Sequence, residues 1–585
     1  MPARTVVSKG CVIALVVGQA ASIGLAQPVT FTEETFASGL FTERRGTNGA
    51  YEWMMGGGCI GDFNNDGFQD VFVLGGNEPD KLFINNGNGT FTNQAAAWGV
   101  AVTHIGSGAI AVDYNKDGWE DIYVTSWGAR SSAPSGTPSQ HKLYRNNGNG
   151  TFTNVAVAAG VHRTSASAAD GFGASFGDYD LDGHLDLAVA GWRTGTGNKI
   201  FHSNGNGTFS DVTSSILGGF SFSTVPSVRG FSPWFIDTNG DRYPDLLWTA
   251  DGMTSKYFRN NANGTFTEIT GASGTGLDGN GMGAYVADLD RDGKPDWYVT
   301  SITTTNVVPS VPGTGNMLYR NLGNHTFAEV SNPAGVKQTG WGWGTAAVDF
   351  DHDGNLDLIA TNGTDQGTYM GEFLTDPTCL FMNNANGTFT SLAGVCGIAH
   401  TGQGRGLVTF DADNDGDQDI IIFSNPGAIT FYRNELDPGT HSYLRVFLNS
   451  RATPGLAPEG IGARVVLNAA ASPQYRWITA NPNYLGNSER SAHFGLAGSL
   501  APVTLRVEWA DGRVSEYASV APNQTITVLS CAADFDRNGQ WGVGDLFAYL
   551  DAWFAGGASA DVNFDKAVGV SDLFDFLDAW FVGCN

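Results

Sequence analysis

The stretch Asp411-Ala412-Asp413-Asn414-Asp415-Gly416-Asp417-Gln418-Asp419 is the clearest copy of a nine-residue pattern, DxDxDGxxD. The pattern occurs seven times, and consecutive copies start 51 to 65 residues apart. Self-similarity at a regular spacing is the signature of a repeat architecture, in which each repeat is one structural unit. The sequence therefore predicts a row of seven related units. The other six copies begin at Asp62, Asp113, Asp178, Asp237, Asp288 and Asp349.

The chemistry of each copy predicts a metal site. Side-chain oxygens at positions 1, 3, 5 and 9, with the backbone carbonyl of position 7, can surround one hard cation, and Ca²⁺ takes about six to eight oxygen ligands. The alternative is a polar turn without a metal, because Asp, Asn and Gly favour turns; seven copies in register favour calcium. The predicted ligands are Asp62, Asn64, Asp66, Phe68, Asp70, Asp113, Asn115, Asp117, Trp119, Asp121, Asp178, Asp180, Asp182, His184, Asp186, Asp237, Asn239, Asp241, Tyr243, Asp245, Asp288, Asp290, Asp292, Lys294, Asp296, Asp349, Asp351, Asp353, Asn355, Asp357, Asp411, Asp413, Asp415, Asp417 and Asp419.

Position 6 is Gly in six of the copies. This indicates a sharp turn with positive φ, which costs a residue with a side chain about 1 kcal/mol or more. The fourth copy has Arg242 at this position. We therefore expect the weakest of the seven metal sites in the fourth copy.

Composition and the N-terminal segment indicate an exported globular protein. The net charge of −27 argues against nucleic-acid binding, because no basic cluster is present to meet phosphates. Residues 1–26 resemble a secretory signal peptide, with Arg4 and Lys9 before an apolar run that ends at Gly24-Leu25-Ala26. The alternative, a first membrane helix, is disfavoured because Gly and Ser interrupt the run. We expect no membrane span and a secreted location, extracellular or at the cell surface.

Each repeat contains four strand-like runs. In the second repeat they cover residues 107–112, 121–126, 141–146 and 151–155. Four short strands per unit of this length predict one blade of a β-propeller. An Asn-Gly turn, here Asn149-Gly150, joins the third and fourth strands. We interpret these Asn residues as hairpin turns rather than glycosylation sites, because they recur where each hairpin needs them.

The seventh repeat lacks its fourth strand, since the pattern stops after Phe431-Tyr432-Arg433-Asn434. A matching run, Val29 to Thr35, stands at the start of the mature chain. We therefore expect the N-terminal strand to complete the last unit and close a ring, which removes exposed sheet edges. Small residues seven and five positions before most of the first aspartates, such as Gly106 and Gly108, predict that the first strand of each unit is the innermost.

These features resemble the FG-GAP or VCBS-type repeats of integrin α-subunit propellers. The resemblance covers about residues 29–436 with seven copies and implies a seven-bladed β-propeller with calcium bound in its hairpin loops. The expected fold is mainly β, with the propeller over 27–437, a small β domain and a small α-helical module. Such an architecture implies a secreted bacterial protein.

Residues 438–529 are expected to form the small β domain. The runs His441 to Val446, Gly460 to Val465, His493 to Leu496 and Val507 to Gly512 resemble the ASPIC/UnbV domain, which commonly follows such propellers. This resemblance implies a module that packs on the propeller and caps it. A ligand site of its own is the less favoured alternative.

The tail, residues 531–585, contains two acidic loops, each followed by a nearly identical amphipathic helix. Duplicated units of this kind resemble a dockerin, which implies an EF-hand-like calcium-binding pair and a cohesin-like partner protein. Lys566 replaces the sixth-position Gly of the second loop, which argues against tight calcium binding there. The alternative is a self-contained helical cap. The expected ligands are Asp534, Asp536, Asn538 and Asp545 in the first loop, and Asp561, Asn563, Asp565 and Asp572 in the second.

Five cysteines remain after the predicted signal peptide. Proximity in sequence predicts the disulfides Cys379–Cys396 and Cys531–Cys584. Cys59 is left over and is expected to be a buried, small hydrophobic residue.

No catalytic signature stands out. The segment 173–177 matches the GxSxG pattern, but it lies in a predicted strand that leads into an acidic loop, whereas a nucleophile elbow leads into a helix. A ligand face is expected opposite the acidic loops, with Trp127, Arg130, Trp192 and Arg193. The favoured hypothesis is a calcium-stabilised propeller that binds an extracellular protein or glycan. The alternative is a polysaccharide lyase or glycoside hydrolase, whose paired carboxylates could come from distant blades.

Overall fold

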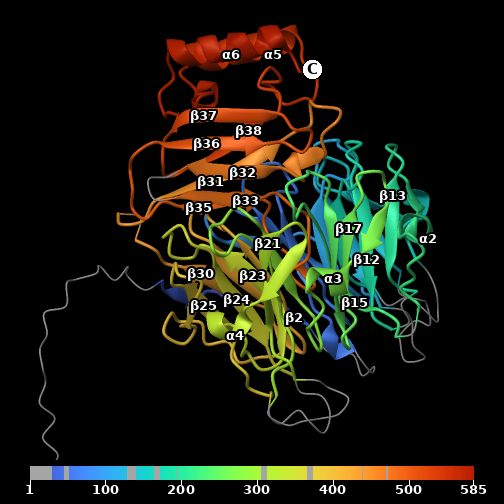
Figure 1. Ribbon diagram of the computed structural model, residues 1–585. Coiled ribbons are helices and arrows are strands. Elements are labelled where there is room, and N and C mark those ends of the chain that lie inside the picture. Colours follow the sequence, from blue (N-terminus) through green and yellow to red (C-terminus); the bar gives the residue numbers. More distant parts are fainter. Residues whose placement is uncertain are drawn as a thin grey trace, which may run out of the picture.

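The computed structural model describes residues 29–44, 52–127, 140–163, 171–193, 196–224, 226–304, 313–364, 373–437, 439–468 and 472–584 (Figure 1). The predicted signal peptide and Arg130 lie outside these residues. The fold is mainly β, and most strands up to residue 434 belong to four-stranded antiparallel sheets that resemble propeller blades.

Apart from one strand added to sheet 7 and one added to sheet 1, each sheet contains strands in chain order, and we number the sheets 1 to 7 by the acidic loop they carry. Sheets 1 to 3 are β3 (Gly58–Gly61), β4 (Asp70–Val73), β5 (Lys81–Asn85) and β6 (Phe91–Asn93); β7 (Gly106–Val112), β8 (Asp121–Ser126), β9 (Lys142–Asn146) and β10 (Phe152–Asn154); and β11 (Gly171–Gly177), β12 (Asp186–Gly191), β13 (Lys199–Ser203) and β14 (Phe209–Asp211). Sheets 4 and 5 are β15 (Arg229–Ile236), β16 (Asp245–Asp251), β17 (Lys256–Asn260) and β18 (Phe266–Glu268); and β19 (Ala284–Ala287), β20 (Asp296–Val299), β21 (Met317–Gly323) and β22 (Thr326–Glu329).

Sheet 6 is β23 (Gly342–Val348), β24 (Asp357–Asn362), β25 (Cys379–Asn383) and β26 (Phe389–Ser391). Sheet 7 combines β27 (Gly404–Phe410), β28 (Asp419–Ser424) and β30 (Thr430–Asn434) with the N-terminal strand β1 (Phe31–Glu33). Short elements lie between these strands: β2 (Glu43–Arg44), which pairs with β29 (Gly427–Ala428), the single-turn helices α1 (Ala156–Ala159), α2 (Thr213–Ile216), α3 (Thr270–Ser273) and α4 (Ser331–Ala334), and the 3₁₀ turn η1 (Glu52–Met54).

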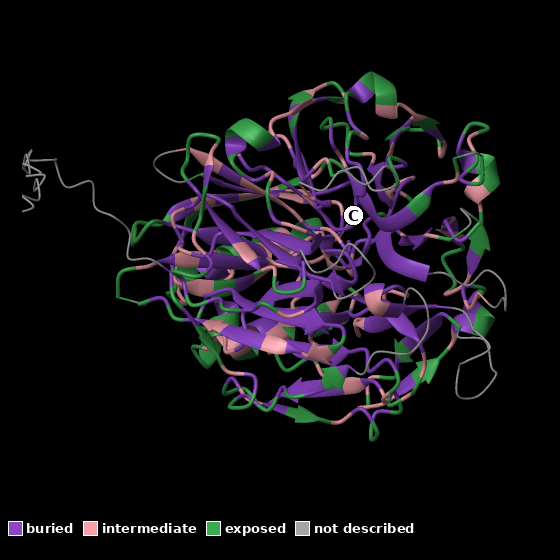
Figure 2. Cartoon of the chain, turned by 90° about the horizontal axis from the view of Figure 1, so that it is seen from below, coloured by how far each residue is buried: buried purple, intermediate pink, exposed green. Residues whose placement is uncertain are grey.

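The predicted pairing of the N-terminal strand with the last repeat is confirmed. β1 runs antiparallel to β30, with Phe31 opposite Asn434. The first strand of sheet 7, β27, also contacts β3 of sheet 1. The two ends of the row of sheets therefore meet. Figure 2 shows buried residues throughout the interior of this assembly and exposed residues mainly along its rim.

A recurrent asparagine links neighbouring sheets. The side chain of Asn85, at the end of the third strand of sheet 1, donates to the carbonyl of Ala412 in sheet 7 at 2.7 Å. The equivalent asparagines reach the carbonyl at position 2 of the acidic loop in the preceding sheet: Asn146 to Phe63, Asn260 to Tyr179, Asn321 to Thr238, Asn383 to Leu289 and Asn434 to Phe350. In sheet 3 this position is Ser203.

The first strands crowd together, as their small residues predicted. A Cβ on Gly173 would lie 2.5 Å from the carbonyl oxygen of Phe231 in the next sheet, and one on Gly283 would lie 2.1 Å from that of Trp343. Real Cβ atoms do not approach so closely. Only glycine allows the backbones to meet at these positions.

The C-terminal β domain contains two sheets. One consists of β31 (Tyr443–Asn449), β35 (Ala492–Gly495) and β38 (Gln524–Leu529), and the other of β32 (Arg464–Asn468), β33 (Pro473–Trp477), β36 (Val503–Glu508) and β37 (Val514–Val520). The 3₁₀ turn η3 (Pro458–Gly460) connects β31 and β32. Alternating burial along β36 places its apolar side chains in a core shared with sheets 2 and 3.

A loop of this domain fills the centre of the ring of sheets. Its strand β34 (Gly486–Asn487) pairs in parallel with β3 as a fifth strand of sheet 1. The Tyr484 hydroxyl donates to the carbonyl of Met54 at 2.9 Å, and the ring packs against Trp343 and Phe231. The indole of Trp234 donates to the carbonyl of Pro482. The C-terminal β domain is therefore packed into the ring and is not a loosely tethered module.

The tail consists of two helices, α5 (Val543–Phe554) and α6 (Val570–Val582), with a 3₁₀ turn, η4 (Ala558–Ala560), between them. Figure 1 shows them stacked on the β domain, on the side away from the ring. Tyr549 and Phe576 stack face to face at 4.0 Å and form the centre of this module. None of the helices among the described residues is both long and apolar enough to cross a bilayer.

The structure confirms one of the two predicted disulfides. Cys531 and Cys584 are bonded and join the two ends of the tail module. The predicted Cys379–Cys396 bond is wrong, because both residues are free thiols. Cys379 packs on the core between sheets 5 and 6, whereas Cys396 lies in the core between sheets 6 and 7, so the two side chains are on opposite sides of sheet 6. Cys59 is fully buried among apolar residues, as expected.

Candidate functional site

The seven acidic loops share one backbone geometry. Residue 6 has positive φ in every loop, including Arg242 at 78° in loop 4. Its N–H donates to the carboxylate of residue 1 at 2.7–3.0 Å throughout, as Gly67 does to Asp62. The predicted turn is therefore confirmed, and Arg242 adopts the left-handed conformation although it has a side chain. In loops 6 and 7 the carboxylates of residues 1, 3 and 5 converge, and in loops 3 and 5 those of residues 1, 3 and 9 converge.

The carboxylate at position 9 has a structural role that the spacing did not reveal. One oxygen of Asp70 accepts the N–H of Asn85 on the third strand at 2.8 Å, and the other accepts the N–H of Phe63 inside the loop at 3.1 Å. The third-strand hydrogen bond recurs in all seven loops at 2.7–2.8 Å. Position 9 thus fastens each loop to its sheet, and a metal would share this group with the backbone.

Within the part of the chain that the structure describes, several loop carboxylates have buried oxygens without a hydrogen-bond partner. They include Oδ1 of Asp349, Asp411 and Asp413, and Oδ1 of Asp180. An unpaired buried oxygen on an ionised carboxylate is costly, and a hard cation is the partner that such a set of oxygens fits. Carboxylate groups that lie close enough to share one ion include Asp178 with Asp180 and Asp186, Asp288 with Asp290 and Asp296, Asp349 with Asp351 and Asp353, and Asp411 with Asp413 and Asp415.

The electrostatics of these loops also favour a cation. Burial, followed by repulsion from neighbouring carboxylates, raises the pKa of Asp351 to about 6. Burial also raises the pKa of Asp62 to about 6 and that of Asp411 to about 7. These carboxyl groups are therefore poorly stabilised as anions by the protein alone, and a bound divalent ion would supply the missing charge.

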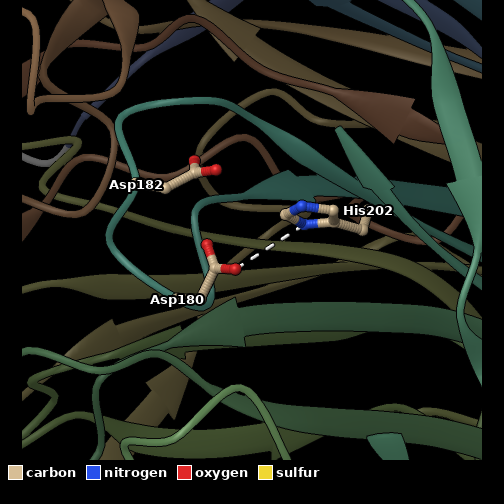
Figure 3. Close-up of side chains that lie close together, drawn as sticks. All are labelled: Asp180, Asp182 and His202. Atoms are coloured by element: carbon tan, nitrogen blue, oxygen red, sulfur yellow. Dashed lines mark ion pairs between the residues drawn. The ribbon is translucent and has the colours of Figure 1, made fainter. Parts of the chain in front are cut away.

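A cation on the third strand lies beside position 3 in three of the loops. In loop 3, His202 lies beside Asp180 (Figure 3), with its Nδ1 3.6 Å from Asp180 and 3.1 Å from Asp186. Its hydrogen bond to Asp186 raises the pKa of His202 to about 9. Arg320 and Arg433 occupy the same strand position and pair with Asp290 and Asp413 in loops 5 and 7. In the sequence, a His or Arg recurs directly before the third-strand Asn or Ser. This pattern could have identified the partners of the loop carboxylates.

Loop 6 differs, because Met382 stands at this third-strand position. Its three aspartates, Asp349, Asp351 and Asp353, converge without a third-strand cation. Loop 7, the clearest copy of the sequence pattern, instead has two of its carboxylates paired with Arg433 and Arg445. The clearest copy of the pattern is therefore not the loop that lacks a third-strand cation.

Loops 1, 2 and 4 have Asn at position 3. Their side-chain amides donate to the carboxylate at position 5, as Asn64 does to Asp66 at 2.7 Å, and the same bond occurs from Asn115 and Asn239. In every loop the N–H of position 7, such as that of Phe68, donates to position 5. Position 7 thus lies next to the predicted site, where its carbonyl oxygen is the remaining expected metal ligand.

The two tail loops contain a helix cap as well as carboxylates. Asp545 accepts the N–H of Gly542 at 2.8 Å, and Asp572 accepts that of Gly569 at 2.8 Å, so the last residue of each loop lies in the first turn of a helix and caps it. Asp534 Oδ1 is buried and unpartnered. Lys566 adopts a φ of 69°, and its ammonium group donates to the carbonyl of Pro522 at 2.7 Å. Lys566 therefore docks the tail on the β domain.

A second candidate site lies at the opposite mouth of the ring, where first strands begin and second strands end. It is a pocket of about 170 Å³, lined by tryptophans and a few polar groups. Asp251 accepts the indole N–H of Trp192 at 2.8 Å, and the guanidinium of Arg229 lies 5.6 Å from the centre of the Trp192 ring. The lining residues are Trp53, Met54, Trp192, Arg229, Phe231, Asp251, Gly252, Asn280, Met282, Ile302, Trp341 and Trp343.

The expected ligand face needs correction at one residue. Trp127 is 1% exposed and belongs to the aromatic core at the ring centre, against Phe172, so it is unavailable to a ligand. Trp192 does line the pocket, Arg193 is exposed beside it, and Arg130 lies outside the described residues. Ser175 of the GxSxG pattern is fully buried in β11 and bonds to Asn481, which excludes a nucleophile elbow there.

Comparison with known sequence families agrees with this architecture. The FG-GAP-like repeat matches residues 62–124, 132–189, 178–248, 237–299 and 307–360, and the ASPIC and UnbV family matches 454–534. The chain contains FG-GAP-like repeats and an ASPIC and UnbV domain. Both resemblances are thereby confirmed. The segments matched by the FG-GAP-like repeat include acidic loops 1 to 6, and the ASPIC and UnbV match includes the loop that fills the ring.

Curated relatives include cartilage acidic protein 1. The Xenopus tropicalis protein is 27% identical over 305 residues, which are 49% of this chain and 42% of the relative. The Mus musculus protein is 24% identical over 438 residues, 72% of this chain and 64% of the relative. The matches therefore span less than two thirds of the length of these relatives.

The solved structures that resemble this chain are more distant. A lectin of Agrocybe aegerita that recognises non-reducing terminal N-acetylglucosamine gives a TM-score of 0.39 at 17% identity, covering 65% of this chain and 86% of the lectin. The exotype rhamnogalacturonan lyase YesX gives 0.37 at 14% identity, covering 76% and 79%.

Proposed function

We propose that this protein is a secreted, calcium-binding, seven-bladed β-propeller that binds an extracellular protein or glycan and is anchored by its tail. The seven numbered sheets would be the blades. Their mutual contacts through the recurrent asparagines, and the meeting of sheets 7 and 1, support a closed ring. The unpartnered carboxylate oxygens of the acidic loops support calcium as the bound ion.

The main support for a binding function is that the C-terminal β domain covers one mouth of the ring and does not cover the other. The C-terminal β domain covers the loop side: Lys116 of loop 2 donates to the carbonyl of Leu456, and Arg291 of loop 5 donates to that of Ser472. The loop of this domain that contains Tyr484 also fills the centre of the ring from that side. A ligand would therefore use the other mouth, where the aromatic pocket lies.

The alternative, an enzyme acting on polysaccharides, has less support. Glycoside hydrolysis uses two carboxylates about 5–10 Å apart. Among the described residues that line the pocket, Asp251 is the one carboxylate, and its Oδ2 already accepts the indole N–H of Trp192. This arrangement is better suited to holding a ligand than to cleaving it.

The tail would act as a dockerin-like anchor for a cohesin-like partner. Exposed aromatic side chains occur at equivalent positions of its two helices: Phe547 and Phe574 are 62% and 61% exposed, and Phe554 and Phe581 are 77% and 75% exposed. Recurrence at equivalent positions of both helices distinguishes these side chains from apolar side chains that are exposed singly. The duplicated face is the surface that we expect a partner to cover.

A glycan array run beside a reducing-sugar assay on a polysaccharide panel tests the function. We expect calcium-dependent binding to a subset of glycans or to an extracellular protein, without release of reducing ends or unsaturated products. Turnover of any polysaccharide would overturn the binding-module proposal in favour of the enzyme. For the tail, the test is a pull-down with the full chain, compared with the Phe547→Ser/Phe574→Ser variant, which we expect to lose its partner.

A further inference from the structure

We propose that the aromatic pocket holds a single pyranose ring of a glycan, with the indole N–H of Trp341 as a donor to one of its oxygens. This inference rests on the proposed binding function and assigns its ligand class and contact residues. The pocket lies at the mouth of the ring that the C-terminal β domain leaves uncovered.

The first reason is an unsatisfied donor. Trp341 is 9% exposed, and its Nε1 is buried without a hydrogen-bond partner among the described residues. The ring is held by Trp343 at 6.0 Å, by Trp53 at 6.0 Å and by Phe373 at 5.5 Å, measured between ring centres. A buried indole usually finds an acceptor, so an unpaired one in the wall of a pocket indicates that a ligand supplies it.

The second reason is the shape and polarity of the remaining wall. Trp53 and Trp192 are half-buried, so part of each indole remains exposed at the pocket. The bond from Trp192 to Asp251 fixes the orientation of that ring in advance, which lowers the entropy lost on binding. A pyranose combines an apolar C–H surface with hydroxyl groups that both donate and accept, and therefore matches aromatic faces beside Asp251 and Asn280.

The third reason concerns size and charge. A volume of about 170 Å³ is smaller than the 300–1,000 Å³ typical of sites for drug-sized ligands, so the pocket accommodates one ring and not a longer segment. Aromatic cages also bind cations, but here Arg229 lies over Trp192 and Arg405 lies 4.5 Å from the centre of the Trp343 ring. Arginines of the protein itself therefore occupy the cation-binding faces of these two rings. This disfavours a cationic ligand and favours a neutral or acidic sugar.

The test uses the full chain in calcium and a panel of methyl pyranosides: glucoside, galactoside, mannoside, N-acetylglucosaminide and glucuronide. Binding is measured by titration calorimetry, together with the ¹H–¹⁵N signals of the indole groups. We expect at least one pyranoside to bind, and the Trp341 indole signal, assigned by its loss in Trp341→Phe, to shift on binding. Removing this donor should weaken binding about five- to tenfold.

Two further variants keep the proposal testable. Trp192→Phe alters a partly exposed side chain and should weaken binding at least as much as Trp341→Phe. It replaces Trp341→Phe in the binding test if that buried substitution impairs folding. The matched control is Trp98→Phe, at a tryptophan on the outer part of sheets 1 and 2 whose indole is already paired with Gln94. Its affinity for the pyranosides should remain close to that of the parent, because Trp98 does not line the pocket.

The outcomes separate this proposal from the function on which it rests. If glycans bind but both pocket variants retain parental affinity, the binding module stands and the pocket assignment is overturned. If indole or p-cresol binds and none of the pyranosides does, the pocket takes an apolar side chain and the sugar assignment is overturned. If neither the glycan array nor the pyranosides give binding, the sugar-ring proposal and glycan binding fail together.

Discussion

The side chain of Asn85 in sheet 1 donates to the carbonyl of Ala412 in sheet 7, at 2.7 Å, although 327 residues separate the two in sequence. This contact joins the beginning and end of the row of sheets on the side of the acidic loops. Asn85 also donates to the carbonyl of Gln69 in its own sheet, and its side chain is 3% exposed. The asparagine thus connects a sheet, its own acidic loop and the neighbouring loop.

Asn85→Ala should destabilise the fold by about 1–3 kcal/mol, because it leaves the carbonyls of Gln69 and Ala412 buried without donors. Chemical denaturation followed by tryptophan fluorescence measures the change. Asn86→Ala, at the exposed neighbouring residue, is the control and should cost less than about 1 kcal/mol. Equal stabilities of the two variants would contradict the role assigned to Asn85.

Arg445→Met should destabilise the contact between the C-terminal β domain and loop 7. Arg445 is fully buried, paired with Asp411 at 3.1 Å and with Glu489, so its removal leaves two buried carboxylates without their cation. Breaking such a pair typically costs about 3–5 kcal/mol. Arg506→Met, which removes a half-exposed partner of Glu508, should cost at most about 1 kcal/mol. Urea denaturation would show no difference between these variants if the buried pair were unimportant.

Removing calcium should lower the melting temperature. Each ion that binds only the folded chain stabilises it by about 2.7 kcal/mol when its free concentration is 100 times Kd. We expect a lower midpoint in EGTA than in millimolar calcium, and a smaller calcium-induced shift in Asp351→Asn, since loop 6 lacks a third-strand cation. Magnesium at the same concentration is the control. An identical midpoint in EGTA and in calcium would refute the metal assignment.

In EGTA, acidification from about pH 7.5 to about pH 5.5 should stabilise the protein. Burial holds the pKa of Asp62 near 6 and that of Asp411 near 7, above their unfolded value of 3.8, so the folded chain binds more protons. Stability from such groups is complete below the unfolded pKa and is lost as pH rises through the folded one. His400, whose pKa burial lowers to about 4, opposes this gain below pH 6.5, but fewer groups act in that direction.

Calcium should reverse this trend, because protons then compete with the ion for the same carboxylates. Melting curves at the two pH values, with EGTA and with calcium, give the four midpoints required. A chain whose midpoint falls on acidification in EGTA would show that the loop carboxyl groups are not held at raised pKa.

Replacing Cys531 and Cys584 together by Ser should loosen the tail alone. The disulfide closes a segment with a sequence separation of 53 residues. Loop-closure entropy for such a segment corresponds to about 4 kcal/mol in the chain-entropy model. Limited proteolysis should then cut between residues 531 and 584 at least tenfold faster, while the main melting transition is unchanged. Cys379→Ser, at a free thiol, is the control and should leave the cleavage rate of the tail unaltered.

Much of the fold could be predicted because its signals are local and repeated. The turn at position 6 follows from Gly and from its αL requirement, and even Arg242 obeys it. The pairing of β1 with β30 followed from a strand missing at one end and present at the other. The partners of the loop carboxylates could not be predicted in this way. His202 and Arg320 reach Asp180 and Asp290 from the third strand, and a single loop pattern does not specify that approach.

By itself, the sequence determined the repeat, the acidic loops, the small residues of the crowded inner strands and the bond between Cys531 and Cys584. These depend on spacing along the chain and on the backbone freedom of single residues. Only the tertiary structure decided that Cys379 and Cys396 lie on opposite sides of a sheet, that Trp127 is buried, and that Tyr484 occupies the ring centre. The reason is physical: which side chains meet across sheets depends on how closely the sheets pack, and packing is a property of the whole assembled ring.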